Sequence, residues 1–394
     1  MSESRSGVSE VFGAFLKLGL TSFGGPVAHI AFFRDEFVDR RRWISPQAYA
    51  DLVALCQFLP GPASSQVGIA LGLMRAGFPG GFAAWLGFTA PSAVALAAFA
   101  LLLQGSNVSP DAAWLHGLKI AAVAVVAQAV WSMGRALCPD APRATIAVLA
   151  AMCMLLASSG WSQVLVIALG AVAGLAGLSG APVAKAEGVL SGVSKRGALS
   201  ALALFLALLV ILPLGVGAGA GRAIAVFDAF YRAGALVFGG GHVVLPLLQA
   251  EVVPPGWVGK DTFLAGYGAA QAVPGPLFTF AAYLGAAMGG VAGAIFCTAA
   301  IFLPACLLVI AALPFWQRLR ADGRAQSALA GVNAAVVGLL LAAFYDPVVT
   351  SAIRSPTDVA IALGAFALLA LWKVSPAIVV VLSALAAAAL SALA

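Results

Sequence analysis

Apolar segments separated by short polar ones run along almost the whole chain. Many approach about 20 residues, the length at which an α-helix crosses a hydrocarbon core about 30 Å thick. The segments of about ten residues with alternating hydrophobicity that typify a transmembrane β-barrel are not seen. We therefore predict an all-α polytopic membrane protein. Its longer helices are expected at 80–103, 112–134, 144–158, 161–179, 198–217, 293–313, 327–345, 356–372 and 376–394.

Shorter apolar segments occur in pairs around breaks rich in glycine and proline. Proline removes a backbone donor and clashes with the preceding turn, so a helix is expected to stop at each break. At membrane depth a stopped helix exposes backbone groups that must face protein or a polar cavity. We expect broken helices or re-entrant hairpins here. The predicted pairs are 11–22 with 27–38, 46–58 with 63–75, 226–237 with 242–250, and 262–273 with 277–288.

The breaks occur twice in one register. Gln57-Phe58-Leu59-Pro60-Gly61-Pro62 returns as Gln271-Ala272-Val273-Pro274-Gly275-Pro276, and Phe23-Gly24-Gly25-Pro26 returns as Phe238-Gly239-Gly240-Gly241. Further pairs share the offset of 214 or 215, namely Lys17 with Arg232, Glu36 with Glu251, and Trp43 with Trp257. His29 and His242 each follow a Phe-Gly-Gly sequence closely. Ordered matches in one register indicate two homologous halves.

These halves are expected to have opposite orientations in the membrane. The predicted organisation is a cytoplasmic N-terminal tail at 1–9, a first repeat at 10–180, a linker with one connecting transmembrane helix at 181–224, and a second repeat at 225–394. An odd number of crossings between the repeats inverts the second. With re-entrant hairpins, 15 of the 21 Lys and Arg residues lie on the cytoplasmic side, against 12 if the short pairs span. We therefore expect an inverted-topology repeat with a periplasmic C-terminus.

Composition narrows the class further. Hydrophobic residues make up 62% of the chain and charged ones 9%, far from a soluble domain. The five cysteines are scattered, without zinc or disulfide spacing. The net charge of +6 comes from bases in short loops, so it indicates topology rather than nucleic acid. Walker A, H-E-x-x-H and G-x-S-x-G sequences are missing, which leaves a secondary transporter or a channel rather than an enzyme.

The helix starts after the breaks are candidate anion sites. A helix that starts at a break presents free N–H groups and the positive end of its dipole. Four such starts follow Pro26, Pro62, Gly241 and Pro276. The candidate ligands are the break residues Gly24, Gly25, Pro26, Pro60, Gly61, Pro62, Gly239, Gly240, Gly241, Pro274, Gly275 and Pro276, the nearby His29, Ser64, Ser65, Gln66, His242 and Thr279, and the amides of Gln57 and Gln271. Alternatively, each break only kinks a packed helix.

Intramembrane cations supply a second argument. Lys17, Lys119 and Arg232 lie within apolar segments, where an ionisable residue is costly and indicates function. Lys17 and Arg232 share one repeat position, so both are expected to face a central anion. The alternatives are that Lys17 extends to the membrane interface and that Arg232 pairs with Asp228 four residues earlier. His29 and His242 are candidate proton carriers; alternatively, each forms a hydrogen bond between two helices.

The paired blocks resemble the two-domain chromate ion transporters, the CHR family. The resemblance covers nearly the whole chain and rests on the Phe-Gly-Gly-Pro block with His29, the Gln57-to-Pro62 block and their second-half partners. It implies export of chromate from the cytoplasm across the bacterial inner membrane, driven by the membrane or proton gradient, with chromate resistance as the result. Gly241 in place of Pro26, and Leu277-Phe278 in place of Ala63-Ser64, suggest that the first half supplies more polar ligands.

The residues alone do not separate chromate from sulfate. The expected partners are chromate or a related oxyanion such as sulfate, membrane lipid, protons as a coupling ion and a second copy of the chain in a homodimer, with no nucleic acid, metal or cofactor. Proton exchange through His29, His242 or Glu36 and exchange for another anion are both open. An anion channel is the alternative of a different class, because it shares the dipole argument without alternating access.

Overall fold

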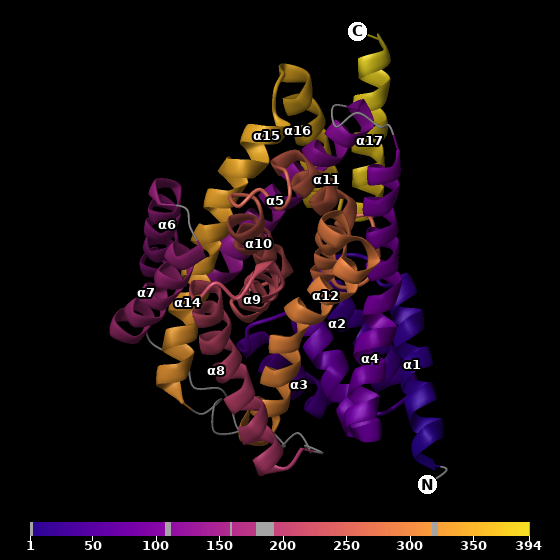
Figure 1. Cartoon of the computed structure of the whole chain (residues 1–394), viewed down its shortest axis with the longest axis vertical. Coiled ribbons are helices and arrows are strands. Elements are labelled where there is room, and N and C mark those ends of the chain that lie inside the picture. The colour runs from indigo at the N-terminus through magenta and orange to yellow at the C-terminus, as the bar shows by residue number, and fades with distance from the viewer. Residues whose placement is uncertain (1–2, 107–111, 158–159, 179–192, 317–321, 394) are drawn as a thin grey trace.

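The computed structural model describes residues 3–106, 112–157, 160–178, 193–316 and 322–393. All regular elements in these ranges are helical, which confirms the predicted all-α class. Five helical segments are long and apolar enough to cross a membrane, as expected of a multi-pass membrane protein. The two termini lie at opposite ends of the long axis (Figure 1).

The first half and the connecting helix follow the predicted order. Their elements are α1 (Glu3–Thr21), α2 (Gly25–Arg34), the π-helical turn η1 (Asp35–Arg40), α3 (Pro46–Phe58), α4 (Ala63–Gly105), α5 (Ala113–Leu137), α6 (Ala141–Leu156), α7 (Gly160–Gly177) and the connecting α8 (Lys195–Gly217). Helix α1 already begins at Glu3, so most of the tail expected at 1–9 is helical. Residues 181–192 of the expected linker lie outside the described residues.

The second half repeats this order. Its elements are α9 (Arg222–Ala235), the 3₁₀ turn η2 (Gly241–Val243), α10 (Val244–Val252), α11 (Lys260–Ala270), the 3₁₀ turn η3 (Leu277–Thr279), α12 (Phe280–Ala312), the 3₁₀ turn η4 (Leu313–Phe315), α14 (Gly323–Ala343), the π-helical turn η5 (Phe344–Val349), α15 (Thr350–Ala352), α16 (Pro356–Ala370) and α17 (Pro376–Leu393).

Helices α4 and α12 each double back on themselves. In α4 the backbone leaves helical geometry at Ala76 and Gly77 (φ 62°, ψ −156°). A Cβ atom on Gly72 would lie 2.3 Å from the carbonyl oxygen of Gly80, a contact that two residues eight apart cannot make in a straight helix. The predicted segments 63–75 and 80–103 are therefore antiparallel helices within α4. Glycine permits both the turn and the close backbone approach.

Helix α12 repeats this reversal at the equivalent residues. Gly289 and Gly290 (φ 63°, ψ −153°) form the turn. A Cβ atom on Gly285 would lie 2.2 Å from the carbonyl oxygen of Gly293. The structure thus repeats the backbone geometry of the first half in the second, beyond the matched sequence blocks.

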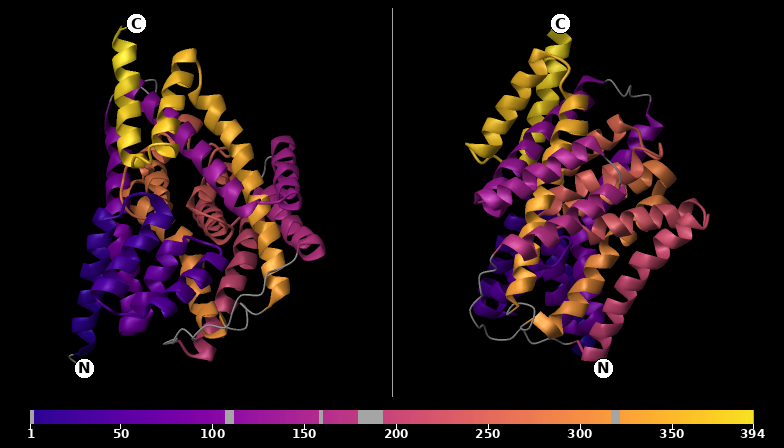
Figure 2. Two further views of the ribbon diagram at one scale, coloured as in Figure 1. Left: turned by 180° about the vertical axis from the view of Figure 1, so that it is seen from behind. Right: turned by 90° about the vertical axis from the view of Figure 1, so that its left-hand side faces the viewer.

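The halves exchange their peripheral helix pairs. Helices α6 and α7 of the first half pack on α14 of the second, whereas α16 and α17 pack on α5 of the first (Figures 1 and 2). Close backbone contacts hold these packings: Gly331 of α14 lies against Gly170 of α7, and Gly117 of α5 against Ala384 of α17. Small residues allow such approach between membrane helices. The halves are therefore interlocked.

Candidate functional site

The Pro-Gly-Pro break of each half is bonded to the Phe-Gly-Gly break of the other. The N–H of Gly275 donates to the carbonyl of Ser22 at 2.9 Å, and the N–H of Gly61 donates to the carbonyl of Val237 at 2.7 Å. Ser22 and Val237 each directly precede the phenylalanine of a Phe-Gly-Gly sequence. These reciprocal bonds join the four breaks in two pairs, and the pairs adjoin, because a Cβ atom on Gly241 would lie 3.7 Å from both Pro26 and Leu277.

Both bonding glycines need their unusual conformation. Gly61 has φ 120° and Gly275 has φ 92°, values that L-residues with side chains rarely adopt. A Cβ atom on Gly61 would lie 3.0 Å from the Ala305 side chain, and one on Gly275 would lie 2.9 Å from Oγ of Ser92. Ser92 and Ala305 are themselves repeat equivalents, so the two breaks are tight in matching ways.

A cavity of about 390 Å³, here called the central cavity, lies beside these breaks. Six of the predicted ligands line it: Gly24, Gly25, Pro26, His242, Gln271 and Gly275. Helix α5 contributes Gln128, and the turn between α16 and α17 contributes Lys373 and Ser375. None of the lining residues that the structure describes is acidic. The cavity therefore combines residues of both halves with one cation.

The N-terminus of α2 opens at this cavity. Helix α2 begins at Gly25, its N-cap Gly24 is left-handed at φ 101°, and no side chain caps it. The first-turn N–H groups of a helix have no intrahelical acceptor, and the dipole adds partial positive charge there. Pro26 in this turn fixes helical geometry at little cost, because its position needs no donor. This terminus is suited to an anion.

Lys373 is the cation that sequence reasoning missed. Its ammonium is paired with no carboxylate among the residues that the structure describes. Its backbone is left-handed (φ 53°), in a turn where Trp372 N donates to Ala367 O and Val374 N donates to Leu368 O. A non-glycine residue in this region is strained, and such strain is concentrated at functional sites. The available signal was a base between the two apolar segments predicted at 356–372 and 376–394.

The two histidines have different surroundings. Nδ1 of His242 lies 2.9 Å from Oη of Tyr267, and His242 lines the central cavity. His29 is buried, with Nδ1 3.3 Å from Oγ of Ser64 and its ring edge-on to Phe88. His29 is not among the lining residues. The structure thus brings only the second-half histidine to the cavity.

The remaining polar candidates mostly support the breaks themselves. The Gln66 amide donates to the carbonyl of Pro60 at 2.8 Å, and the Thr279 hydroxyl donates to that of Pro276 at 2.7 Å. Gln57 is exposed and does not line the cavity, unlike its equivalent Gln271. The other candidates from the breaks and the helix starts that do not line it are Pro60, Gly61, Pro62, Ser64, Ser65, Gln66, Gly239, Gly240, Gly241, Pro274, Pro276 and Thr279.

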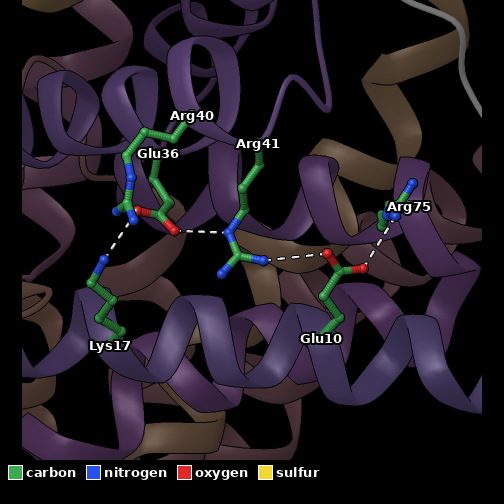
Figure 3. Close-up of polar contacts among 6 residues, drawn as sticks. All are labelled: Glu10, Lys17, Glu36, Arg40, Arg41 and Arg75. Carbon is green, nitrogen blue, oxygen red and sulfur yellow. Dashed lines mark hydrogen bonds and ion pairs between the residues drawn. The ribbon is translucent and has the colours of Figure 1, made fainter.

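Lys17 belongs to an ion-pair network on the first half. Its Nζ lies 3.2 Å from Oε2 of Glu36, and the Glu36 carboxylate also forms ion pairs with Arg40 and Arg41 (Figure 3). Burial would raise the pKa of Glu36, but hydrogen bonds from Arg41 and Lys17 outweigh it and hold the pKa below its usual value. Arg41 also forms an ion pair with Glu10, and Glu10 forms a second ion pair with Arg75 (Figure 3).

The second half has an equivalent pair. Arg232 contacts Glu251 at 2.9 Å and Asp228 at 2.8 Å, so the pairing with Asp228 considered from sequence is present. Neither Lys17 nor Arg232 lines the central cavity. Lys119, the third intramembrane cation, contacts Asp261 at 2.7 Å beside a separate cavity of about 250 Å³. All three cations are thus held by carboxylates.

Comparison with known proteins identifies the family of this chain. A model described as "Chromate transporter" matches residues 9–175 and 224–389, one match to each half. The chain belongs to the chromate transporter family. It is 32% identical over 383 residues to a chromate transport protein of Pseudomonas aeruginosa, covering 95% of this chain and 90% of the relative.

Other members are more distant. A probable chromate transport protein of Synechococcus elongatus is 27% identical, covering 91% of this chain and 88% of the relative. A chromate transport protein of Cupriavidus metallidurans is 26% identical, covering 91% and 86%. No solved structure matches the chain significantly. Membership of the chromate transporter family confirms the predicted resemblance and makes the chain a membrane transporter rather than an enzyme.

Proposed function

We propose that this chain is a secondary transporter that exports chromate from the cytoplasm and binds it in the central cavity. The observation that carries this proposal is a cavity lined by residues of both halves, with an uncapped helix N-terminus and with Lys373, which pairs with no carboxylate among the described residues; none of the described lining residues is acidic. A divalent oxyanion needs N–H donors and compensating positive charge. The names of the relatives support chromate as the substrate.

Within the cavity the roles divide by chemistry. The first-turn N–H groups of α2 bind anion oxygens at the positive end of the helix dipole. Lys373 supplies the full charge, and His242 and Gln271 supply side-chain hydrogen bonds. Carboxylates hold Lys17 and Arg232 outside the lining, so the expectation that these two cations bind the anion stays a prediction. Binding to Lys17→Gln and Arg232→Gln variants tests that prediction, with unchanged affinity removing them from the site.

The two halves are proposed to form an inverted repeat that alternates access to this cavity. The contact between Lys17 and Glu36 spans the Gly-Gly-Pro break, as expected if α1 and α2 form a hairpin that returns to the same side. Arg232 and Glu251 make the equivalent contact. The termini lie at opposite ends of the molecule, in keeping with a cytoplasmic N-terminus and a periplasmic C-terminus (Figure 2). Rocking of two such halves is a common transport mechanism.

Counterflow in proteoliposomes tests the proposed function. Purified protein is reconstituted, the vesicles are loaded with unlabelled chromate, and uptake of labelled chromate is followed with the membrane potential clamped at zero. A carrier accelerates labelled uptake by exchange with the internal anion. Uptake that ignores internal chromate but follows an imposed voltage would instead identify an anion channel. Sulfate loaded in place of chromate tests whether the transporter accepts both anions.

A further inference from the structure

His242 joins the central cavity to a buried tyrosine. The ring lines the cavity, and its Nδ1 lies 2.9 Å from Oη of Tyr267. Tyr267 is completely buried and is not a lining residue. Its ring packs edge-on against Phe280, with centroids 5.7 Å apart. Tyr267 therefore does not contact an anion in the cavity directly and acts on it through its hydrogen bond to His242.

The surroundings of Tyr267 decide which nitrogen of His242 carries the proton. A neutral imidazole has one N–H, and the partner of Nδ1 determines where it is. Among the described residues, the hydrogen bond that the structure shows for the Tyr267 hydroxyl is the one to Nδ1 of His242. A buried O–H donor is nearly always bonded, so the hydroxyl proton of the fully buried Tyr267 points at that nitrogen. The tyrosine proton is then donated to Nδ1 of His242, which leaves the histidine proton on Nε2.

We propose that Tyr267 is a positioning residue that holds His242 in its Nε2–H form, so that the cavity selects oxyanions carrying no proton of their own. The inference rests on the proposed function and deepens it. Nε2–H, the Lys373 ammonium and the first-turn N–H groups of α2 are all donors. Chromate and sulfate are dianions that only accept. Hydrogen phosphate must also donate its O–H, and the side chains of the described lining offer it only neutral oxygens, those of Gln128, Gln271 and Ser375, rather than a carboxylate.

The first half has no matching arrangement. His29 faces the Ser64 hydroxyl at 3.3 Å and lies outside the cavity lining. The proposed selection by a histidine donor therefore belongs to the second half, whereas the sequence predicts more of the polar ligands in the first half.

Tyr267→Phe tests this proposal. The substitution keeps the packing on Phe280 and removes the donor to Nδ1, so His242 is free to place its proton on either nitrogen. In proteoliposomes at mildly alkaline pH, we expect KM for chromate to rise about three- to tenfold, the value of one lost net hydrogen bond. Phosphate should also inhibit chromate uptake more strongly relative to sulfate, because an unprotonated Nε2 accepts the phosphate O–H.

Matched variants separate positioning from a structural defect. Tyr283→Phe removes an equally buried hydroxyl, one that donates to Thr262 O at 3.1 Å outside the central cavity, and should leave the phosphate-to-sulfate inhibition ratio unchanged. In a His242→Gln background, Tyr267→Phe should have no further effect. An unchanged ratio in Tyr267→Phe, or an equal effect in the His242→Gln background, would overturn the inference.

The unaltered protein supplies a second test that needs no substitution. Sulfate should inhibit its chromate uptake far more strongly than phosphate at the same concentration. Equal inhibition would overturn the proposed selectivity even if Tyr267→Phe did not fold. Saturable chromate uptake with the wrong selectivity refutes only this inference, whereas the absence of saturable chromate uptake refutes the proposed function and the inference with it.

Discussion

Replacing Lys373 with glycine should separate stability from anion binding, because the two effects have opposite signs. Lys373 is left-handed at φ 53°, which costs a non-glycine residue roughly 1–2 kcal/mol. Glycine relieves this strain but loses about 0.5–1 kcal/mol more backbone entropy on folding. The folded protein should therefore keep its stability or gain up to about 1.5 kcal/mol. The lost charge-assisted hydrogen bond should cost about 1.5–3 kcal/mol, or roughly ten- to a hundredfold in chromate affinity.

The chain itself offers the matched control. Arg42 has the same φ of 53° in a turn with the same bonding, where Arg41 N donates to Glu36 O and Trp43 N donates to Phe37 O. Its repeat equivalent is Gly256 at φ 72°, so glycine already occupies this turn once. Arg42→Gly should show the same stability change with little loss of affinity.

Thermal unfolding in detergent and chromate binding to the purified variants measure the two quantities. The reasoning fails if Lys373→Gly binds chromate with the affinity of the unaltered protein. It also fails if affinity is lost only in step with folded protein, because the cation would then act through the fold rather than on the anion. Lys373→Arg keeps the charge and should retain part of the affinity.

Three further predictions concern the framework. The pKa of Glu36 is lower in the folded than in the unfolded protein, so its ion pairs stabilise the fold above the unfolded pKa of about 4.3, and this stabilisation is lost as pH falls through the folded pKa. The melting temperature should therefore drop with acid in the unaltered protein and drop less in Glu36→Gln. Identical pH profiles of the two proteins would exclude this role. Gly72→Leu should abolish folded protein, since its Cβ would lie 2.3 Å from backbone, whereas Gly13→Leu, with nothing within 4 Å, should express normally. A cysteine at position 40 should resist impermeant reagents in intact cells, and labelling there would refute the hairpin topology.

Much of the framework was predictable because it follows from local chemistry. Proline and glycine end helices wherever they occur, so the breaks and their repetition in one register could be seen in the sequence. The turns within α4 and α12 fall between the predicted segments 63–75 and 80–103 and between 277–288 and 293–313, although the reversal of the chain at these points was not predicted. The early start of α1 at Glu3 was not, because its polar first turns hide a helix that apolar periodicity does not mark.

The candidate site was harder to predict because it depends on which groups meet across the halves. Lys17 and Arg232 were expected at the anion from their shared register, yet Glu36 and Glu251 share that same offset and pair with them. The repeated cation and carboxylate together were the signal for an ion pair. Lys373 reaches the cavity because α16 and α17 pack on α5 of the other half, an exchange that spacing along the chain does not show.

The position of a bound chromate tests the central claim most directly. Chromium scatters anomalously, so crystals grown with chromate would place the anion without reference to the protein model. Our account predicts one chromium peak in the central cavity, within hydrogen-bonding reach of Lys373, His242 and the first turn of α2. A peak beside Lys17 or Arg232 with the central cavity empty would contradict it.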